Sequence, residues 1–250
     1  MKKLGLIGYP LGHSFSKKYY LDKFESEQIK GIDYDLYSLP DIAEFPKLYL
    51  QDQQFYGFNV TIPYKQAVLP LMDELSPEAA QMEAVNCIRI QHKDGRAILK
   101  GFNTDAYGFE ASLKPLLQPQ HTKALVLGNG GAAKAVLYSL RKLNIAYAVV
   151  SRSETNGDLT YQQLSKEIIE EYTIIINCSP IGTFPKVDEA PQIPYEYLSE
   201  SHLLYDLIYN PTETLFLQKG REKGATIKNG YEMLLLQAEK NWEIWNAETA

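Results

Sequence analysis

The sequence predicts an α/β protein of two domains, the second of which is built on a doubly wound parallel sheet. Apolar runs typical of strands alternate with helical patterns along the 250 residues, as in folds built on largely parallel sheets. A glycine-rich turn between a strand and a helix begins only near residue 128, although such a turn normally stands at the start of its domain. The half of the chain that precedes it therefore needs a fold of its own.

The composition excludes several classes of function. With 45% apolar and 22% charged residues, the chain has the profile of a soluble globular protein. A net charge of −6 gives no basic surface for nucleic acid, and no apolar run is long enough for a membrane span or a signal peptide. Cys87 and Cys178 lack the spacing of a metal site or a disulfide framework. We therefore expect no metal, no membrane or nucleic-acid partner, and a cytoplasmic location.

The first half of the chain alternates between strands and helices. We expect strands at 4–9, 34–39, 55–62, 84–90 and 97–102, and helices at 17–27, 42–51, 64–75 and 106–117. Ser14 and Ser16 stand before the first of these helices, where serine is a preferred cap. A pair of hydroxyls beside a helix N-terminus also suits the carboxylate of a ligand, so both interpretations stay open.

One stretch of the first half joins polar side chains to a lysine. Asn59 and Thr61 can hydrogen-bond a polyol, and Lys65 lies in the first turn of a predicted helix, where the helix dipole disfavours a cation. This position suits a general base, although a solvated lysine is the more common outcome. Asp105 follows a strand directly, and it either caps the next helix or shares a proton with Lys65.

The glycine-rich turn predicts a nucleotide site. Residues 124–127 form a buried strand in this prediction, and Gly128, Gly130 and Ala133 then have the spacing of a dinucleotide fingerprint before a helix at 134–143. The first glycine permits the tight turn, the second lets a pyrophosphate approach the backbone, and the small third residue lets the helix pack on the strand. The phosphates would face the helix N-terminus.

The end of the next strand, 146–150, indicates which nucleotide is bound. An NAD-binding fold usually carries an acid at this point, whereas this chain has Ser151, Arg152 and Ser153. A guanidinium and two hydroxyls suit a 2′-phosphate, which a carboxylate would repel. We therefore predict NADP. The alternative is a solvated Arg152 with Glu154 turned toward the ribose.

The rest of the second half continues the same pattern. We expect strands at 172–177, 203–208 and 225–228, a helix at 212–223 and a long amphipathic helix from Tyr231, with a sparse segment at 154–171 where one crossover is trimmed. The loop at 178–183 would lie at the carboxyl end of a parallel strand, where such folds bind cofactors.

These motifs together resemble the shikimate dehydrogenase family, and the likeness runs along nearly the whole chain. Seven ordered stretches carry it, at residues 8–16, 59–65, 84–86, 101–105, 128–133, 206–211 and 230–238. The resemblance implies a Rossmann-like NADP-binding domain beside an α/β substrate domain. It also implies reversible reduction of 3-dehydroshikimate to shikimate, in a cleft between the two domains, on the route to chorismate and the aromatic amino acids.

The resemblance assigns a role to individual residues. Lys65 and Asp105 would be the catalytic pair. The substrate would be bound by Ser14, Ser16, Asn59, Thr61, Asn86, Tyr209 and Gln237, and the cofactor by Gly128, Asn129, Gly130, Gly131, Ala132, Ser151, Arg152, Ser153 and Gly230. Residues 1–103 and 232–250 would form the substrate domain and 104–231 the cofactor domain, with the C-terminal helix packing back on the first. The partner would be this small-molecule substrate, and the protein a monomer or homodimer.

Three positions depart from the family's usual pattern. Lys17 stands where proline is frequent, Cys87 where threonine is usual, and the cofactor motif has serines in place of asparagine and threonine. None of these changes removes a catalytic group. An NAD-dependent quinate or quinate/shikimate dehydrogenase is an alternative, but quinate users tend to carry threonine in place of Ser16. A non-catalytic nucleotide sensor is another, but it would not need both Lys65 and Asp105.

Overall fold

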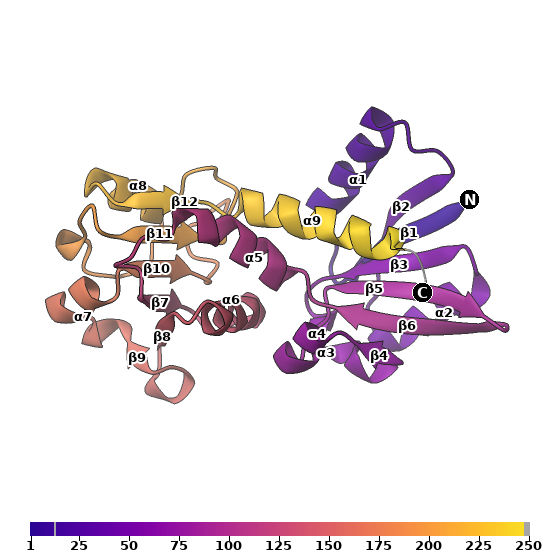
Figure 1. Cartoon of the computed structure of the whole chain (residues 1–250), viewed down its shortest axis with the longest axis horizontal. Coiled ribbons are helices and arrows are strands. Elements are labelled where there is room, and N and C mark those ends of the chain that lie inside the picture. Colours follow the sequence, from indigo (N-terminus) through magenta and orange to yellow (C-terminus); the bar gives the residue numbers. More distant parts are fainter. Residues whose placement is uncertain (13, 248–250) are drawn as a thin grey trace. The chain divides into compact units, whose positions relative to one another are not determined.

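The chain folds into two compact units, each with its own six-stranded sheet (Figure 1). The structure is a computed structural model that describes residues 1–12 and 14–247. One unit is Met1–Thr104 together with the chain from Ala238, and the other is Asp105–Gln237. His13, which belongs to the first of the seven stretches above, lies outside the described residues, and the side chain of Glu154 is likewise not described.

The first unit is built on a mixed sheet with the strand order β2-β1-β3-β5-β6-β4. Its strands are β1 (Lys2–Gly8), β2 (Ile32–Ser38), β3 (Phe55–Val60), β4 (Glu74–Leu75), β5 (Cys87–Lys93) and β6 (Arg96–Phe102), and its helices are α1 (Phe15–Ser26), α2 (Phe45–Gln51), α3 (Tyr64–Ala67) and α4 (Pro77–Met82). Because β1 and β3 pair in parallel, their carboxyl ends meet at one edge of the sheet. The loops that lead into α1 and α3 therefore begin side by side.

The helix predicted at 64–75 is wrong beyond its first turn. α3 ends at Ala67, and a 3₁₀ turn at Leu69–Leu71 leads to β4. Pro70 has no backbone N–H and disfavours the helical conformation of the residue before it, so the α-helix cannot continue. With only four residues, α3 has little dipole, so the dipole effect expected on Lys65 is weak.

Helices cover both faces of the first sheet. Leu4 and Leu6 of β1 pack with α1 and with the C-terminal part of α9 (Tyr231–Asn246), whereas Ile7 belongs to the core shared with α2, α3 and α4. The indole Nε1 of Trp245 donates to the carbonyl of Ile88 at 3.0 Å. The predicted return of the C-terminal helix to the first domain is thus confirmed from Ala238 onward.

The second unit is a doubly wound sheet whose six strands are all parallel, in the order β9-β8-β7-β10-β11-β12. Its strands are β7 (Lys123–Leu127), β8 (Ala146–Ser151), β9 (Leu159–Thr160), β10 (Ile174–Asn177), β11 (Leu203–Asp206) and β12 (Thr226–Lys228), and its helices are α5 (Asp105–Leu113), α6 (Gly131–Lys142), α7 (Lys166–Glu171) and α8 (Leu215–Glu222). This is the Rossmann strand order, so the predicted fold class is confirmed. Ligands of such sheets bind where the order reverses, here between β7 and β10.

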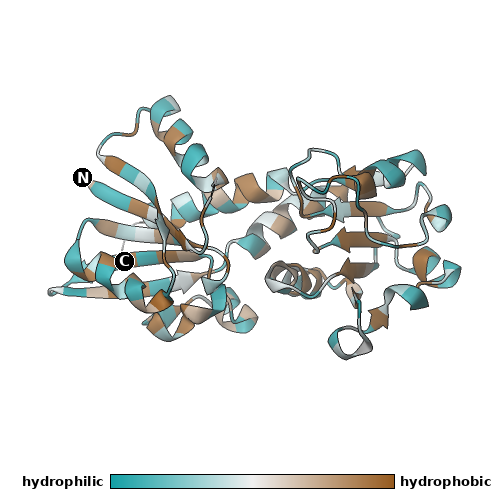
Figure 2. Cartoon of the chain, turned by 180° about the vertical axis from the view of Figure 1, so that it is seen from behind, coloured by the Kyte–Doolittle hydropathy of each residue, from teal (hydrophilic) through white to brown (hydrophobic). Residues whose placement is uncertain are grey.

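Successive side chains of the central strands point to opposite faces of the sheet and pack into two different cores. Leu125 and Leu127 of β7 pack with α7 and α8, and Ala124 and Val126 pack with α5 and α6. Both faces are covered, so β7, β10 and β11 are hydrophobic along most of their length (Figure 2). The segment at 154–171 holds only short regular elements, which include the two-residue β9 and the six-residue α7.

One helix limit and one limit of the second unit differ from the prediction. α5 ends at Leu113 and continues only as a 3₁₀ turn, because Pro115 stops it as Pro70 stops α3. The start of α9 belongs to the second unit up to Gln237, whereas a domain limit was expected at 231/232. A Cβ on Gly108 of α5 would lie 2.4 Å from the carbonyl oxygen of Met233, so this first part of α9 packs directly on α5.

Candidate active site

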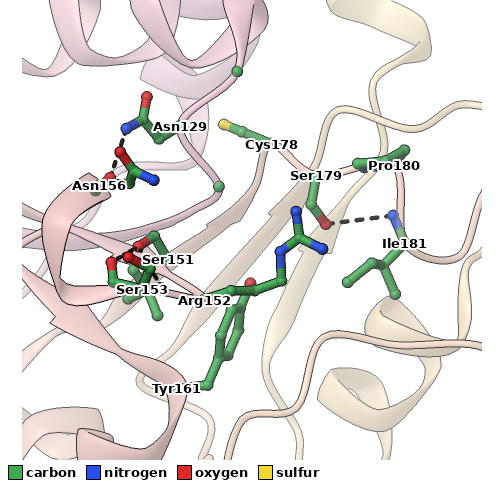
Figure 3. A pocket seen from close by; sticks show the side chains of 13 residues that line it. Asn129, Ser151, Arg152, Ser153, Asn156, Tyr161, Cys178, Ser179, Pro180 and Ile181 are labelled. Atoms are coloured by element: carbon green, nitrogen blue, oxygen red, sulfur yellow. Dashed lines mark hydrogen bonds between the residues drawn. The ribbon is translucent and has the colours of Figure 1, made fainter.

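A cavity of about 870 Å³ opens at the carboxyl ends of β7, β8 and β10 (Figure 3). Its lining comes from the glycine turn, from the end of β8 and the segment after it, and from the loop after β10. The lining residues are Gly128, Asn129, Gly130, Val150, Ser151, Arg152, Ser153, Asn156, Tyr161, Cys178, Ser179, Pro180 and Ile181. The cavity therefore lies at the switch point of the sheet, where the strand order predicts a ligand.

The glycine turn leaves room for a diphosphate. Gly128 has φ +101°, a conformation that favours glycine, and its N–H donates to the Val150 carbonyl at 2.9 Å. No atom lies within 4 Å of a Cβ built on Gly130 or Gly131. Gly130 caps α6 without a side-chain hydrogen bond, and the first turn of α6, which includes Ala132, carries no acid. The backbone N–H groups at the start of α6 and the open space beside Gly130 and Gly131 fit the phosphates of a dinucleotide.

Arg152 is the cation of this cavity. It is exposed, it projects into the cavity with Tyr161 (Figure 3), and none of the ion pairs in the described part of the chain involves it. Burial raises the pKa of the Tyr161 hydroxyl, while the positive charge of Arg152 acts in the opposite direction. A guanidinium at the end of the second strand, outside those ion pairs, fits the 2′-phosphate of NADP.

The two serines that flank Arg152 differ in what their hydroxyls do. The Ser151 hydroxyl donates to the Ser153 carbonyl and accepts from the Ser153 N–H, so it holds the turn together. The Ser153 hydroxyl lies 2.6 Å from the Thr155 hydroxyl and accepts from the Thr155 N–H at 3.3 Å. Ser151 therefore shapes this end of the cavity, and Ser153 with Thr155 offers the hydroxyl oxygens. Asn129 links the glycine turn to the segment after β8, because its side chain donates to the Asn156 carbonyl.

In the first unit, several predicted residues meet at the edge where β1 and β3 end. Ser14 caps α1 by accepting from the Lys17 N–H at 3.5 Å. Burial raises the pKa of the Tyr34 hydroxyl, and the nearby side chain of Ser16 acts in the opposite direction. Thr61 is tied to β1 by its N–H, which donates to the Ile7 carbonyl at 2.9 Å. Both predicted functions of the serines, capping and ligand binding, are compatible with this arrangement.

A buried polar network runs behind that edge. The Tyr34 hydroxyl donates to Oδ1 of Asn59 at 2.8 Å, and Nδ2 of Asn59 donates to the Asn86 carbonyl at 3.4 Å. The side chain of Asn86 accepts from the Thr104 N–H at 2.8 Å and donates to the Thr104 hydroxyl oxygen at 3.0 Å. Since Asn59 is 5% exposed and both its polar atoms are engaged, it orients its neighbours in this structure.

This network fixes the main chain beside both predicted catalytic residues. Lys65 is half-buried, and its carbonyl accepts from the Val85 N–H at 2.7 Å, one residue before Asn86. Thr104, held by Asn86, directly precedes Asp105, the first residue of α5. The backbone of Lys65 is therefore held by Val85, which directly precedes Asn86, and the residue before Asp105 is held by Asn86 itself.

Three predicted residues have other surroundings. Tyr209 follows β11 and is 42% exposed. Gln237 is 7% exposed on α9, and its Nε2 donates to the Leu234 carbonyl at 2.8 Å. Gly230 is not among the residues that line the cavity, and a Cβ there would lie 2.1 Å from the Leu207 carbonyl oxygen. Close backbone packing therefore accounts for this glycine without a cofactor.

The sequence reasoning missed several residues of these sites. Asn241, which lies four positions after Gln237 on the same face of α9, is fully buried and accepts from Thr104. That spacing was a signal that could have identified it. No comparable signal indicated Tyr34 or Tyr161. Over residues 1–12 and 14–247, no group of His, Cys, Asp or Glu is placed to hold a metal, and no helix combines the length and the apolarity that crossing a membrane requires.

Comparisons with known proteins agree with this geometry. Residues 6–88 match the family model described as the shikimate dehydrogenase substrate binding domain. The shikimate dehydrogenase (NADP(+)) of Caldanaerobacter subterraneus subsp. tengcongensis is 35% identical over 263 residues, which cover 99% of this chain and 92% of that protein.

Solved structures share the fold over the same length. A chorismate mutase/shikimate 5-dehydrogenase fusion protein from Clostridium acetobutylicum has a TM-score of 0.84 at 36% identity, covering 100% of this chain and 92% of that one. Shikimate 5-dehydrogenase from Thermus thermophilus, solved in complex with NADP(H) and shikimate, has a TM-score of 0.84 at 30% identity, covering 99% and 94%.

Proposed function

We propose that this chain, which belongs to the shikimate dehydrogenase family, is an NADP-dependent oxidoreductase that reversibly reduces 3-dehydroshikimate to shikimate. The reaction belongs to the synthesis of chorismate and the aromatic amino acids. The observation that carries the proposal is the cavity at the switch point of the second sheet, with an open glycine turn at one side and Arg152 at the other.

The cavity offers a separate group for each charged part of NADP. The N–H groups at the start of α6 and the backbone of Gly130 would hold the diphosphate, and Arg152 with Ser153 would hold the 2′-phosphate. When bound, the reduced cofactor supplies the hydride for the carbonyl carbon of the substrate. An exposed guanidinium among hydroxyls, with no carboxylate among the described side chains that line the cavity, favours NADP over NAD.

The proton of the reaction needs a group of the protein. Reduction places a proton on the carbonyl oxygen, and oxidation removes it, so one side chain must act as both acid and base. We assign that role to the ammonium of Lys65 and propose that Asp105 orients it together with the reacting hydroxyl. The substrate's carboxylate and remaining hydroxyls would be bound by Ser14, Ser16, Thr61, Asn86, Tyr209 and Gln237, with Asn59 supporting Asn86 from behind.

The proposal also includes which unit binds which ligand, where the protein acts and in what oligomeric state. The first unit, which holds the edge where β1 and β3 end, would bind shikimate, and the second unit, which holds the cavity, would bind NADP. The protein would act on this small molecule in the cytoplasm, as a monomer or homodimer. Free thiols at Cys87 and Cys178 support a reducing compartment.

Substitution of Lys65 tests the catalytic assignment. Lys65→Met should lower kcat for shikimate oxidation by about 10²- to 10⁴-fold, the usual contribution of a general acid–base group, while KM for shikimate stays near that of the parent. Gln66→Ala is the matched control, because Gln66 is the exposed neighbour of Lys65 on the same helical turn. Near-normal turnover in Lys65→Met would overturn the assignment.

The parent protein separates the remaining functions. Its turnover is measured with shikimate and with quinate, each paired with NADP⁺ and with NAD⁺. Shikimate with NADP⁺ should give the highest kcat/KM. A preference for quinate with NAD⁺ would favour the quinate dehydrogenase alternative, and dinucleotide binding without turnover of either substrate would favour a sensor.

A further inference from the structure

Asp206 is a buried carboxylate for which the proposed reaction has no use. It ends β11 with 0% exposure, and within residues 1–12 and 14–247 no lysine or arginine forms an ion pair with it. Its Oδ2 accepts from the Thr214 hydroxyl at 2.6 Å, and its Oδ1 accepts from the Ile208 N–H at 3.0 Å and from Nδ2 of Asn177 at 3.1 Å. A buried charge without a cation is costly, so a role for it is expected.

Asn177 connects this carboxylate to the wall of the cofactor cavity. It ends β10, beside Asp206 in the parallel pair of β10 and β11. Its Oδ1 accepts from the Ser179 N–H at 3.0 Å and from the Ser179 hydroxyl at 2.7 Å, and its Nδ2 reaches the Ile181 carbonyl at 3.3 Å. Ser179, Pro180 and Ile181 line the cavity (Figure 3). A continuous set of hydrogen bonds thus leads from Asp206 to the surface that meets the cofactor.

The charge at Asp206 strengthens the orientation of the Asn177 amide that the Ser179 N–H and the Ile181 carbonyl also favour. An ionised carboxylate can only accept, so it draws Nδ2 of Asn177 toward β11 and leaves Oδ1 facing the two donors of Ser179. Hydrogen bonds to an ionised group are also roughly twice as strong as those between neutral groups. A neutral residue at this position would hold Asn177 less firmly, because the charge-assisted part of the hydrogen bond from Nδ2 would be lost.

We propose that Asp206 is a positioning residue for cofactor binding, which holds the loop 178–181 in its binding shape through Asn177. The proposal rests on the proposed use of this cavity for NADP. Part of the affinity for the dinucleotide would then depend on Asp206, which ends β11 and does not itself line the cavity.

The ionisation of Asp206 gives this role a pH dependence. Burial raises the pKa of Asp206 to about 6, and the hydrogen bonds from Thr214, Ile208 and Asn177 act against that rise. The titratable groups that face it are Cys178 and Tyr195, whose pKa values are raised by burial and, in second place, by the Asp206 charge. Asp206 loses its charge as pH falls through about 6, and dinucleotide affinity should fall with it.

Dinucleotide binding measured from pH 5 to pH 8 tests the proposal. Because the 2′-phosphate of NADP⁺ itself titrates near pH 6, the dissociation constant of NAD⁺ is measured beside that of NADP⁺. At pH 7, Asp206→Asn should weaken both dinucleotides by about ten- to a hundredfold, as for a lost charge-assisted hydrogen bond, and its NAD⁺ affinity should no longer change near pH 6. Tyr205→Phe is the matched control, since it removes a buried 2.7 Å hydrogen bond to Ser112 from the same strand and leaves the loop untouched.

Substitution of Thr214 provides a second measurement, the midpoint of the pH profile of dinucleotide affinity, which would not change if Asp206 had a purely structural role. Its hydroxyl lowers the pKa of Asp206, so Thr214→Val should move the midpoint of the pH profile upward, and Thr214→Ser should restore it. If Asp206→Asn fails to fold, the presence or absence of this shift decides the question. Parent-like affinity and an unchanged pH profile in Asp206→Asn would overturn the positioning role. A parent that binds neither dinucleotide would overturn the proposed function instead.

Discussion

Thr104 donates a hydrogen bond of 2.6 Å to Oδ1 of Asn241, which lies 137 positions later in the chain. The two residues are 2% and 0% exposed, so neither has water as an alternative partner. Thr104 is also held by Asn86 and directly precedes Asp105. A residue of the C-terminal helix therefore helps to fix the backbone beside the proposed active-site carboxylate.

Removing the Asn241 side chain should reduce both stability and turnover. We expect Asn241→Ala to lower the free energy of unfolding by about 0.5–1.5 kcal/mol, because the Thr104 hydroxyl loses its 2.6 Å acceptor and keeps only the longer 3.2 Å contact with Oδ1 of Asn86. The less constrained Thr104 should lower kcat more than it raises KM for shikimate. Urea unfolding and steady-state kinetics measure the two effects. Asn246→Ala, which removes an exposed amide from the same helix, should change neither, and equal behaviour of the two variants would contradict the role of Asn241.

Replacing Arg152 should separate the two cofactors. A charge-assisted hydrogen bond contributes about 1.5–3 kcal/mol, so Arg152→Ala should raise KM for NADP⁺ by about ten- to a hundredfold and leave KM for NAD⁺ nearly unchanged. Arg141→Ala, on the exposed face of α6, is the control for loss of a positive charge in the same unit. Equal weakening of both cofactors, or a parent that already prefers NAD⁺, would refute the assignment of Arg152.

Two glycines should respond to alanine in opposite ways. Gly130 has φ −78° and open space at its Cβ position, so Gly130→Ala should fold like the parent and bind NADP⁺ more weakly, because the methyl group occupies space that the diphosphate needs. Gly230→Ala would place a methyl group 2.1 Å from a backbone oxygen, and it should destabilise the fold by about 1–3 kcal/mol or more. Thermal unfolding and NADP⁺ titration of both variants measure the contrast. A Gly230→Ala protein as stable as the parent would show that the backbone at Leu207 can move.

The free energy of unfolding should depend on pH because of Asp206. Burial raises the pKa of this carboxyl from 3.8 to about 6, so the folded state holds its proton more tightly than the unfolded state does. Its contribution to stability is therefore fully present below about pH 4 and is lost as pH rises through about 6. The loss amounts to about 3 kcal/mol.

Urea unfolding of the parent and of Asp206→Asn between pH 4 and pH 8 measures this contribution of Asp206. The contributions of the other titrating groups cancel when the free energy of unfolding of the variant is subtracted from that of the parent. The parent should lose about 3 kcal/mol relative to the variant across that range. A constant difference would mean that Asp206 titrates alike in the folded and unfolded states. The ionised form that the proposed cofactor role requires is thus the form that costs stability.

The sequence predicted best what depends on neighbouring residues. The strand, glycine turn and helix at 124–143 follow from apolar runs and from turn chemistry within one short segment, and all three are present. The helix expected at 64–75 failed although Pro70 was visible, because its periodicity was given more weight than the missing N–H.

The sites were less predictable, because side-chain partners come from distant segments. Ser151 was expected to contact phosphate, but its hydroxyl is used within its own turn, which only coordinates reveal. Tyr34 and Asn59 are 25 positions apart in sequence, and no local pattern joins them. The direct roles of Lys65 and Asp105 came from the resemblance to a family, and they stay predictions until the variants are measured.

The position of Trp245 has a consequence for the order in which the chain can fold during synthesis. Its indole packs against the backbone of Gly57 so closely that a Cβ there would lie 2.3 Å from the ring nitrogen, and it completes the core that Leu4, Leu6 and Tyr20 begin. Domains usually fold as they leave the ribosome, the N-terminal one first. Here the first sheet emerges first, but the core that it shares with α1 stays open until residues 238–246 have been made. The second unit, encoded entirely between these two parts, can therefore finish folding before the first.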